Sequence, residues 1–355
     1  MATPRATPQN LFGPPPPDID LSESRAEGVL AAAGTLMPIA TIFVALRLLS
    51  RTKVQRIPLQ ADDWICVASL VPLWGYFVVV YYLTQNGLGR HIWAPSDEQL
   101  IHYFKAAFAS GLVYFVALLV VKLAVIALYR RIFTMIKPLY VCVFLTIGFY
   151  IAATTTWLAN CRPISRHWDQ SVYPQLPGNC VINTYAFAIA SAAINTAIDV
   201  VILLVPVRPV LKLHMRTPQK VLVLGVFFLG SFVCVASFLR LYYLLPFSHG
   251  IHNVTWYTST NVTWYASTNI IWTIAEICLA VVCACLPTLR PLLHWTLQVL
   301  NTTIRSLLAS FALRPRSGSS SGSGSAPLEP EARTKTGATA EPATIASSER
   351  WIPLE

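Results

Sequence analysis

Long apolar stretches, separated by short polar ones, dominate this chain. About twenty apolar residues, each adding 1.5 Å along a helix, span a hydrocarbon core of roughly 30 Å. Seven stretches reach that length, so each predicts a membrane-spanning helix. The pattern therefore predicts an all-α membrane protein built as a seven-transmembrane helix bundle, with spans at Val29–Leu49, Trp64–Leu83, Ala107–Tyr129, Leu139–Leu158, Tyr185–Val205, Val221–Leu245 and Asn269–Leu286.

The third stretch gives the clearest signal. From Leu112 to Tyr129 only Lys122 is charged at neutral pH, and Arg130 with Arg131 ends the run. A charge at that depth requires partners on neighbouring helices, because lipid offers it none.

The segments outside the bundle divide the chain further. Residues 1–27 are polar and Pro-rich, which predicts a disordered tail without a cleavable signal peptide, so the first span is expected to act as a signal anchor. The membrane domain is expected over residues 28–291. Apolar residues at helical spacing among arginines predict an amphipathic interfacial helix over 292–314. The Ser, Gly, Pro and charged residues of 315–355 predict a disordered tail.

Composition supports this assignment. The chain is 55% hydrophobic and 12% charged, with a mean hydropathy of +0.55, whereas a soluble domain carries about a quarter charged residues. The formal net charge is +10, but the basic residues lie in short loops between apolar runs. That distribution excludes a nucleic-acid partner and indicates helix orientation relative to the lipid bilayer.

Loop charge predicts which end faces the cytosol. With the N-terminus outside, ten basic residues fall in the cytoplasmic loops and four in the outer loops. The positive-inside rule then places the N-terminus outside and the C-terminus in the cytoplasm. The two sets are Arg51, Lys53, Arg56, Arg130, Arg131, Lys137, Arg208, Lys212, Arg216 and Lys220 inside, and Arg90, Lys105, Arg162 and Arg166 outside.

Two further features agree with that orientation. Asn253 and Asn261 begin N-x-T glycosylation acceptors, and both fall in the last outer loop. Cys161 and Cys180 flank another outer loop, where an oxidising compartment favours a disulfide between them. The six other cysteines lie in apolar runs.

Several ionisable residues are predicted within the membrane. Lys122 on the third span and Asp199 on the fifth are at similar depth, with Asn195 one turn before Asp199 on the same face. Glu276 and Arg240 form a second candidate pair. These pairs could stabilise helix packing, or they could line a ligand or ion site.

A series of motifs resembles one known family. The series includes ADDW at Ala61–Trp64, GLGRHIW at Gly87–Trp93 and YRRIF at Tyr129–Phe133, followed by Cys161-Arg-Pro, Gly178-Asn-Cys and Cys285-Leu-Pro-Thr-Leu-Arg-Pro. In this order and spacing they resemble the fungal rhodopsin-like integral membrane family, which includes the satratoxin-cluster membrane proteins and receptor-like relatives.

This resemblance implies seven helices, an outer N-terminus, an outer disulfide and no established biochemical activity. The chain departs from the family at Asn261, where relatives commonly carry Asp.

The chemistry-bearing motifs of enzymes are missing. The predicted membrane domain, residues 28–291, contains no HExxH, GxSxG, Walker or GxGxxG motif, so a non-enzymatic protein is expected. The seventh span has no Lys that could hold retinal, and the outer histidines show no metal-ligand spacing, so no cofactor or metal is expected. Asp62 and Asp63 are expected to cap the second span or to contact a cytoplasmic partner.

Two functions remain open. A receptor-like sensor would bind an unknown small molecule near the outer helix ends and signal to a cytoplasmic partner; its candidate ligand residues are Arg90, His91, Trp93, Trp168 and Trp264. A small-molecule or proton-coupled transporter would instead use Lys122, Asp199, Arg240 and Glu276 as a substrate or proton path. The family resemblance implies a link of such a transporter to secondary metabolism. The plasma membrane is favoured over an internal membrane.

Overall fold

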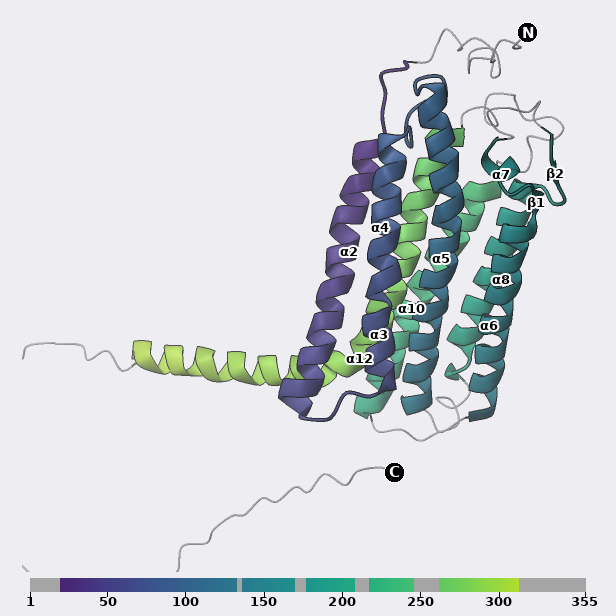
Figure 1. Ribbon diagram of the computed structural model, residues 1–355. Helices are drawn as coiled ribbons and strands as arrows, with labels where there is room; N and C mark the ends of the chain where they lie inside the picture. Colours follow the sequence, from purple (N-terminus) through teal and green to yellow (C-terminus); the bar gives the residue numbers. More distant parts are fainter. Residues whose placement is uncertain (1–19, 133–135, 170–176, 208–216, 246–261, 313–355) are drawn as a thin grey trace, which may run out of the picture. The chain divides into compact units, whose positions relative to one another are not determined.

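The computed structural model describes residues 20–132, 136–169, 177–207, 217–245 and 262–312 (Figure 1). Two compact units divide the chain at Thr302 and Thr303, and the features below belong to the first unit, except for the end of α12 from Thr303 to Ala312. The long helices are α2 (Ala26–Leu49), α4 (Leu70–Gln85), α5 (Asp97–Ile132), α6 (Ile136–Ala159), α8 (Thr184–Leu204), α10 (Thr217–Leu244) and α12 (Val262–Ala312). The short elements are the π-helix η1 (Ser50–Gln55), α3 (Ala61–Ala68), α7 (Arg166–Asp169) and the two-residue strands β1 (Cys161–Arg162) and β2 (Asn179–Cys180).

The prediction of a helical membrane protein is confirmed. In the described part of the chain, six helical segments are long and apolar enough to cross a membrane: Ala26–Gln55, Ala61–Gln85, Asp97–Arg131, Lys137–Ala159, Thr184–Leu204 and Thr263–Leu289. Within α10, the segment Gly230–Leu244 is a shorter apolar helix. The count of seven spans therefore stays a prediction.

Large apolar side chains are exposed on the outward faces of the helices. Val71, Val78 and Phe144 expose 76%, 64% and 76% of their surface. In water such exposure would be costly, whereas acyl chains solvate it. Lipid therefore completes the burial of these helices.

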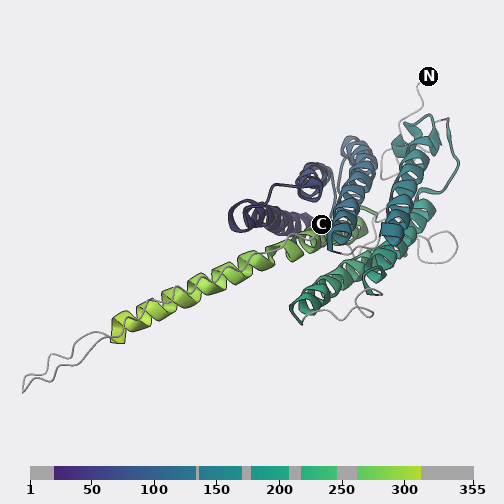
Figure 2. The same ribbon diagram turned by 90° about the horizontal axis from the view of Figure 1, so that it is seen from below.

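Helix α5 occupies a central place in the packing. It packs against α3, α4 and α6, while α8 packs against α6 and α10; Figure 2 views the same helices from below. The helix begins ten residues before the predicted span at Ala107. Ser96 and Gln99 stabilise this beginning, since the Gln99 carboxamide accepts a hydrogen bond from Ser96 N at 2.9 Å and the Ser96 hydroxyl accepts one from Gln99 N at 3.3 Å.

Helix α12 is longer than either helix predicted for that part of the chain. It runs from Val262 to Ala312, although Pro287 and Pro291 lie within it. The predicted span Asn269–Leu286 and most of the predicted interfacial helix are therefore parts of one helix.

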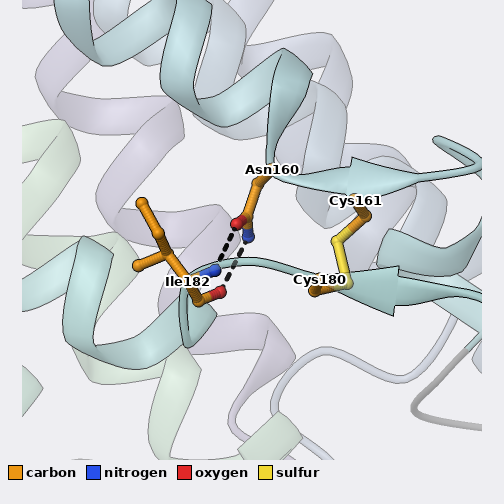
Figure 3. Close-up of a disulfide and its surroundings, with 4 residues drawn as sticks. All are labelled: Asn160, Cys161, Cys180 and Ile182. Carbon is orange, nitrogen blue, oxygen red and sulfur yellow. Dashed lines mark hydrogen bonds between the residues drawn. A yellow bond between two sulfur atoms is a disulfide. The ribbon is translucent and has the colours of Figure 1, made fainter.

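The disulfide between Cys161 and Cys180 is present (Figure 3). The two cysteines face each other across the antiparallel pair β1–β2. Beside them, the Asn160 carboxamide accepts a hydrogen bond from Ile182 N at 2.8 Å and donates one to Ile182 O at 2.9 Å. We refer to this end of the helix bundle as the disulfide end.

The loop Gly87–Trp93 connects α4 to α5 at the disulfide end. Gly89 N donates to Thr263 O at 3.0 Å, and Gly89 O accepts from Arg25 N at 2.8 Å, so the loop joins the beginnings of α2 and α12. Gly89 has φ +82°, and a Cβ there would lie 2.7 Å from Ala26 N. Only glycine satisfies both demands, which explains this part of the GLGRHIW motif.

Candidate functional site

Two buried ion pairs lie within the bundle. Lys122 Nζ on α5 is 2.9 Å from Asp199 Oδ1 on α8, and it also donates to Asn195 O at 3.1 Å. Arg240 on α10 lies 3.6 Å from Glu276 on α12. A lone charge at the bilayer centre costs about 2.5–3.5 kcal/mol on insertion scales, so each partner reduces the cost of burying the other.

Tyr114 of α5 completes the second pair. Its hydroxyl accepts a hydrogen bond from the Arg240 guanidinium and donates one to Glu276 Oε2 at 3.1 Å. The guanidinium carbon also lies 4.2 Å from the centre of the Tyr114 ring, a cation–π distance. Arg240 is therefore held by both an anion and an aromatic face.

Asn195 and Ser237 connect the two ion pairs. The Asn195 amide donates to Asp199 Oδ2 at 3.3 Å and to Glu276 Oε1 at 2.8 Å. The Ser237 hydroxyl lies 3.1 Å and 2.8 Å from the same two oxygens. This hydroxyl has one hydrogen and can donate a hydrogen bond to only one of the two carboxylate oxygens at a time. We call these seven side chains the polar network: Tyr114, Lys122, Asn195, Asp199, Ser237, Arg240 and Glu276.

The five residues predicted as a buried polar cluster all belong to this network. It joins α5, α8, α10 and α12, the four helices expected to supply it. Sequence reasoning missed Tyr114 and Ser237. Ser237 precedes Arg240 by three residues, so helical spacing alone would have placed them on one face.

A cavity of about 200 Å³ lies on the disulfide side of the polar network. Arg240 and Tyr114 belong to both, so the network forms one wall of the cavity. The other walls are mainly aromatic and apolar, with a few polar groups. They are Tyr76, Leu83, Tyr103, Ala107, Ser110, Gly111, Phe115, Trp157, Phe187, Ala188, Ser191, Ala266, Asn269, Ile270 and Thr273. We call this space the network cavity.

A much smaller pocket contacts the opposite side of the network. Its volume is about 40 Å³, and its walls include Lys122, Asp199, Tyr129 and Cys234. The polar network thus separates two hollow regions, and each region touches one of its ion pairs.

None of the five predicted ligand residues lines the network cavity. His91 stacks on Trp264 with ring centres 4.3 Å apart, and Arg25 covers the Trp264 ring at 4.2 Å. Arg90 is exposed, and its carbonyl accepts from the Thr263 hydroxyl at 2.6 Å. His91 and Trp264 thus pack against each other where the α4–α5 loop meets the beginning of α12, while a ligand role for these residues stays a prediction.

The remaining two candidates are also packed against protein. Trp93 is 8% exposed, and Trp168 meets Phe108 edge-on with ring centres 5.7 Å apart. The glycosylation acceptors Asn253 and Asn261 lie outside the described residues.

His167, which sequence reasoning left aside, lies in an aromatic cluster at the disulfide end. Its ring centre is 4.7 Å from that of Phe108 and 4.6 Å from that of Trp157. Burial among these rings lowers the pKa of His167, since a charged imidazolium would lose its hydration there. Trp157 also lines the network cavity.

A second charged cluster lies at the other end of the bundle. Asp62 and Asp63 were expected to cap α3, and Asp63 does accept from Gln60 N at 3.1 Å. Both carboxylates also bind Arg47, which is fully buried, at 2.6 Å and 2.8 Å. Arg131 of α5 approaches Asp62 to 3.3 Å.

Arg47 extends this second cluster to α12. One of its guanidinium nitrogens donates to Ala284 O at 2.7 Å. Arg47 lies inside the first apolar run, where a single Arg near the end of a span reads as a flanking residue. Its burial therefore could not be read from the apolar pattern.

Comparisons with known proteins agree with this architecture. The fungal rhodopsin domain matches residues 46–295. The chain is 28% identical to a SAT4 family membrane protein of Emericella nidulans over 51% of this chain and 49% of that protein. The match therefore spans about half the length of that relative.

Two further relatives align over more of the chain. One is the polyenoic acids biosynthesis gene cluster protein Ba17b of Metarhizium anisopliae, 26% identical over 72% of this chain and 71% of that protein. The other is the receptor GIN3 of Arthrobotrys oligospora, 27% identical over 81% of this chain and 68% of that protein. No solved structure matches the chain. With the domain match covering most of the helical region, the chain belongs to the fungal rhodopsin domain family of membrane proteins.

Proposed function

We propose that this protein is a non-enzymatic, receptor-like sensor that binds a small molecule in the network cavity. The observation that carries the proposal is the shared wall: Arg240 and Tyr114 line the cavity and also belong to a polar network that joins four helices. A ligand that alters the contacts of either side chain changes the balance of hydrogen bonds on α5, α8, α10 and α12. Such differential contact is what a ligand needs to shift a conformational equilibrium.

The proposal includes seven spans, with α10 as the sixth and the disulfide end outside the cell. The basic loops and the disulfide support this orientation. In it, the network cavity opens toward the outer half of the bundle, and the cluster of Arg47, Asp62 and Arg131 lies at the cytosolic end. Helix α5 carries Tyr114 and Arg131 and so connects the two. The plasma membrane is the proposed location.

One relative gives independent support. The receptor GIN3 of Arthrobotrys oligospora is named as a receptor, and it aligns with 81% of this chain. At 27% identity the relationship supports a receptor-like class and leaves the ligand open.

A test of sensing needs a reporter at the cytosolic end. Thr52 and Tyr140 are exposed there, so spin labels on Thr52→Cys and Tyr140→Cys report the separation of η1 and α6. In lipid nanodiscs, a compound that occupies the cavity is expected to shift the distance distribution between the labels. The same compound should give no shift in a cavity-filled Ala188→Phe variant. Compounds that bind the cavity without any shift would contradict sensing.

A transporter is the second candidate, and the small pocket beside Lys122 and Asp199 favours it. With the network cavity on the other side, the polar network connects two hollow regions. Proteoliposomes distinguish the candidates. A transporter accumulates a bound compound, or moves protons with it, and loses this activity in Asp199→Asn. A sensor binds the compound and moves none.

A further inference from the structure

The network cavity contains a buried cation with one unused donor. Arg240 is 8% exposed, and one terminal nitrogen of its guanidinium serves Tyr114 and Glu276. Its Nε–H has no hydrogen-bond partner among the described residues. Buried donors in native proteins are rarely left in this state, so an unpartnered one on a cavity wall indicates a place for an acceptor.

Asn269 supplies the matching acceptor. Its Oδ1 is buried and also lacks a partner within the described part of the chain. Asn269 and Arg240 line the same cavity. A ligand hydroxyl can accept from one and donate to the other, and separate acceptor and donor groups can do the same.

The charges around the cavity exclude a second anion. Glu276 already neutralises Arg240, and Asp199 neutralises Lys122. The polar network therefore has no net formal charge. An anionic ligand would add an uncompensated negative charge to a buried site, which low-dielectric surroundings disfavour strongly.

The remaining walls fit a ring system. Aromatic side chains come from four helices, and Gly111 allows one of them to approach closely, because a Cβ at Gly111 would lie 3.1 Å from the Trp157 ring. Flat aromatic walls favour flat, apolar ligands with few polar groups. The aromatic residues are Tyr76, Tyr103, Tyr114, Phe115, Trp157 and Phe187.

We propose that the network cavity takes an uncharged, ring-containing ligand whose hydroxyl or carbonyl group hydrogen-bonds to Arg240 and whose donor group binds Asn269. This assignment rests on the cavity of the proposed function and adds the chemical class of its ligand.

Three probes of one ring system test the class. In 2-naphthol the ring carries a neutral hydroxyl, in 2-naphthoate an anion, and in naphthalene no polar group. Binding is measured by equilibrium dialysis against the full-length protein in nanodiscs, with empty nanodiscs subtracting partition into lipid. We expect 2-naphthol to bind about tenfold more tightly than either of the others, the effect of a hydrogen bond to a charged group. Equal affinities, tighter binding of 2-naphthoate, or no specific binding of any probe would overturn the proposal.

Variants locate the binding. Asn269→Leu should weaken 2-naphthol about tenfold and leave naphthalene unchanged. Asn179 is exposed at the same end and lies outside the cavity, so Asn179→Leu is the matched control and should change neither. Ala188→Phe fills the cavity and should abolish both. If Asn269→Leu and Ala188→Phe melt like the wild type yet bind 2-naphthol as tightly as it does, the binding is elsewhere and the assignment is wrong.

Failure of this inference can be told apart from failure of sensing. Binding of 2-naphthol without a change in the spin-label distance leaves the ligand class intact and removes the sensor. A distance change caused by 2-naphthoate, blocked by Ala188→Phe, retains the sensor and removes the uncharged class.

Discussion

At the residue scale, each charged side chain of the polar network depends on its ion-pair partner to remain buried at low cost. Lys122 and Asp199 are 4% and 9% exposed. Removing one partner of a buried pair leaves a charge without compensation, whereas removing both restores an apolar interior. The network is therefore expected to tolerate paired changes better than single ones.

This difference gives the first prediction. Asp199→Asn should destabilise the protein by about 3–5 kcal/mol, because Lys122 stays charged and loses its anion. The double variant Lys122→Met with Asp199→Leu should recover most of that loss. Thermal unfolding in nanodiscs measures both, and a single variant as stable as the wild type would show that the pair has no part in helix packing.

The charge swap separates packing from ligand binding. Lys122→Asp combined with Asp199→Lys restores the pair in reverse. If expression lost in each single variant returns in the swap, the pair serves packing; if stability returns without transport or sensing, the pair also has a functional role.

His167 carries the pH prediction. Its pKa is lowered from the ordinary value of 6.5 because aromatic side chains bury it. The unfolded chain therefore binds a proton at a higher pH than the folded one. The contribution of neutral His167 to the stability of the folded protein is complete above about pH 6.5. It decreases as the pH falls from that value to the folded-state pKa. Melting temperatures at pH 7.5 and 5.5 should differ more for the wild type than for His167→Gln, and equal differences would contradict the assignment.

At the element scale, the loop between α4 and α5 has a structural role that its sequence motif did not predict. Gly89 N and O bind the beginnings of α12 and α2. The sequence predicted a ligand role for Arg90, His91 and Trp93, because exposed aromatic and basic residues in an outer loop are typical of binding sites. In the structure this loop also contacts distant segments, as His91 does with Trp264, and spacing along one chain segment does not reveal such contacts. A ligand role for these residues stays a prediction.

Gly89 can be tested against a matched glycine. Gly89→Ala combines an unfavourable φ with a Cβ 2.7 Å from Ala26 N, so a loss of about 1–3 kcal/mol is expected. Gly28 has nothing within 4 Å of its added Cβ and lies inside α2. Gly28→Ala should therefore stabilise the helix by about 0.5–1 kcal/mol. Equal melting temperatures for the two variants would count against the constraint at Gly89.

The disulfide acts at the same scale. Cys161 and Cys180 are separated by 19 residues, and closing a loop of this size in the unfolded chain stabilises the fold by about 3 kcal/mol. Replacing both by Ala should lower the melting temperature, while the single exposed change Asn179→Ala beside them should not. Peptide mapping under non-reducing conditions identifies the bond directly.

At the scale of the whole molecule, the apolar pattern was sufficient to predict a helical membrane protein and the helices that supply the polar network. Runs of apolar residues indicate that lipid surrounds the helices, and a charged residue within such a run indicates an oppositely charged partner on a neighbouring helix. The network cavity could not be predicted, because its walls are ordinary apolar and aromatic residues such as Tyr76, Trp157 and Phe187. Their convergence depends on how the helices pack. Arg47 was missed for the same reason.

Orientation yields the prediction for the whole chain. With the disulfide end outside, Asn253 and Asn261 should carry glycans and Asn301 should not. Removal of the glycans with an endoglycosidase should reduce the apparent mass. The double variant Asn253→Gln with Asn261→Gln should show no such reduction, and Asn301→Gln should behave like the wild type. Glycosylation at Asn301 alone would reverse the orientation.

The pairing of Lys122 with Asp199 also constrains how the protein is made. Helix α5 leaves the ribosome before α6 and α8, so Lys122 enters the membrane while its counter-ion has yet to be synthesised. Until α8 arrives, the lone ammonium raises the cost of moving α5 into lipid by about 2.5–3.5 kcal/mol, so we expect α5 to stay beside the insertion machinery or a membrane chaperone. A nascent chain stopped after α6 should therefore be retained there and degraded, and one extended through α8 should be released into the bilayer.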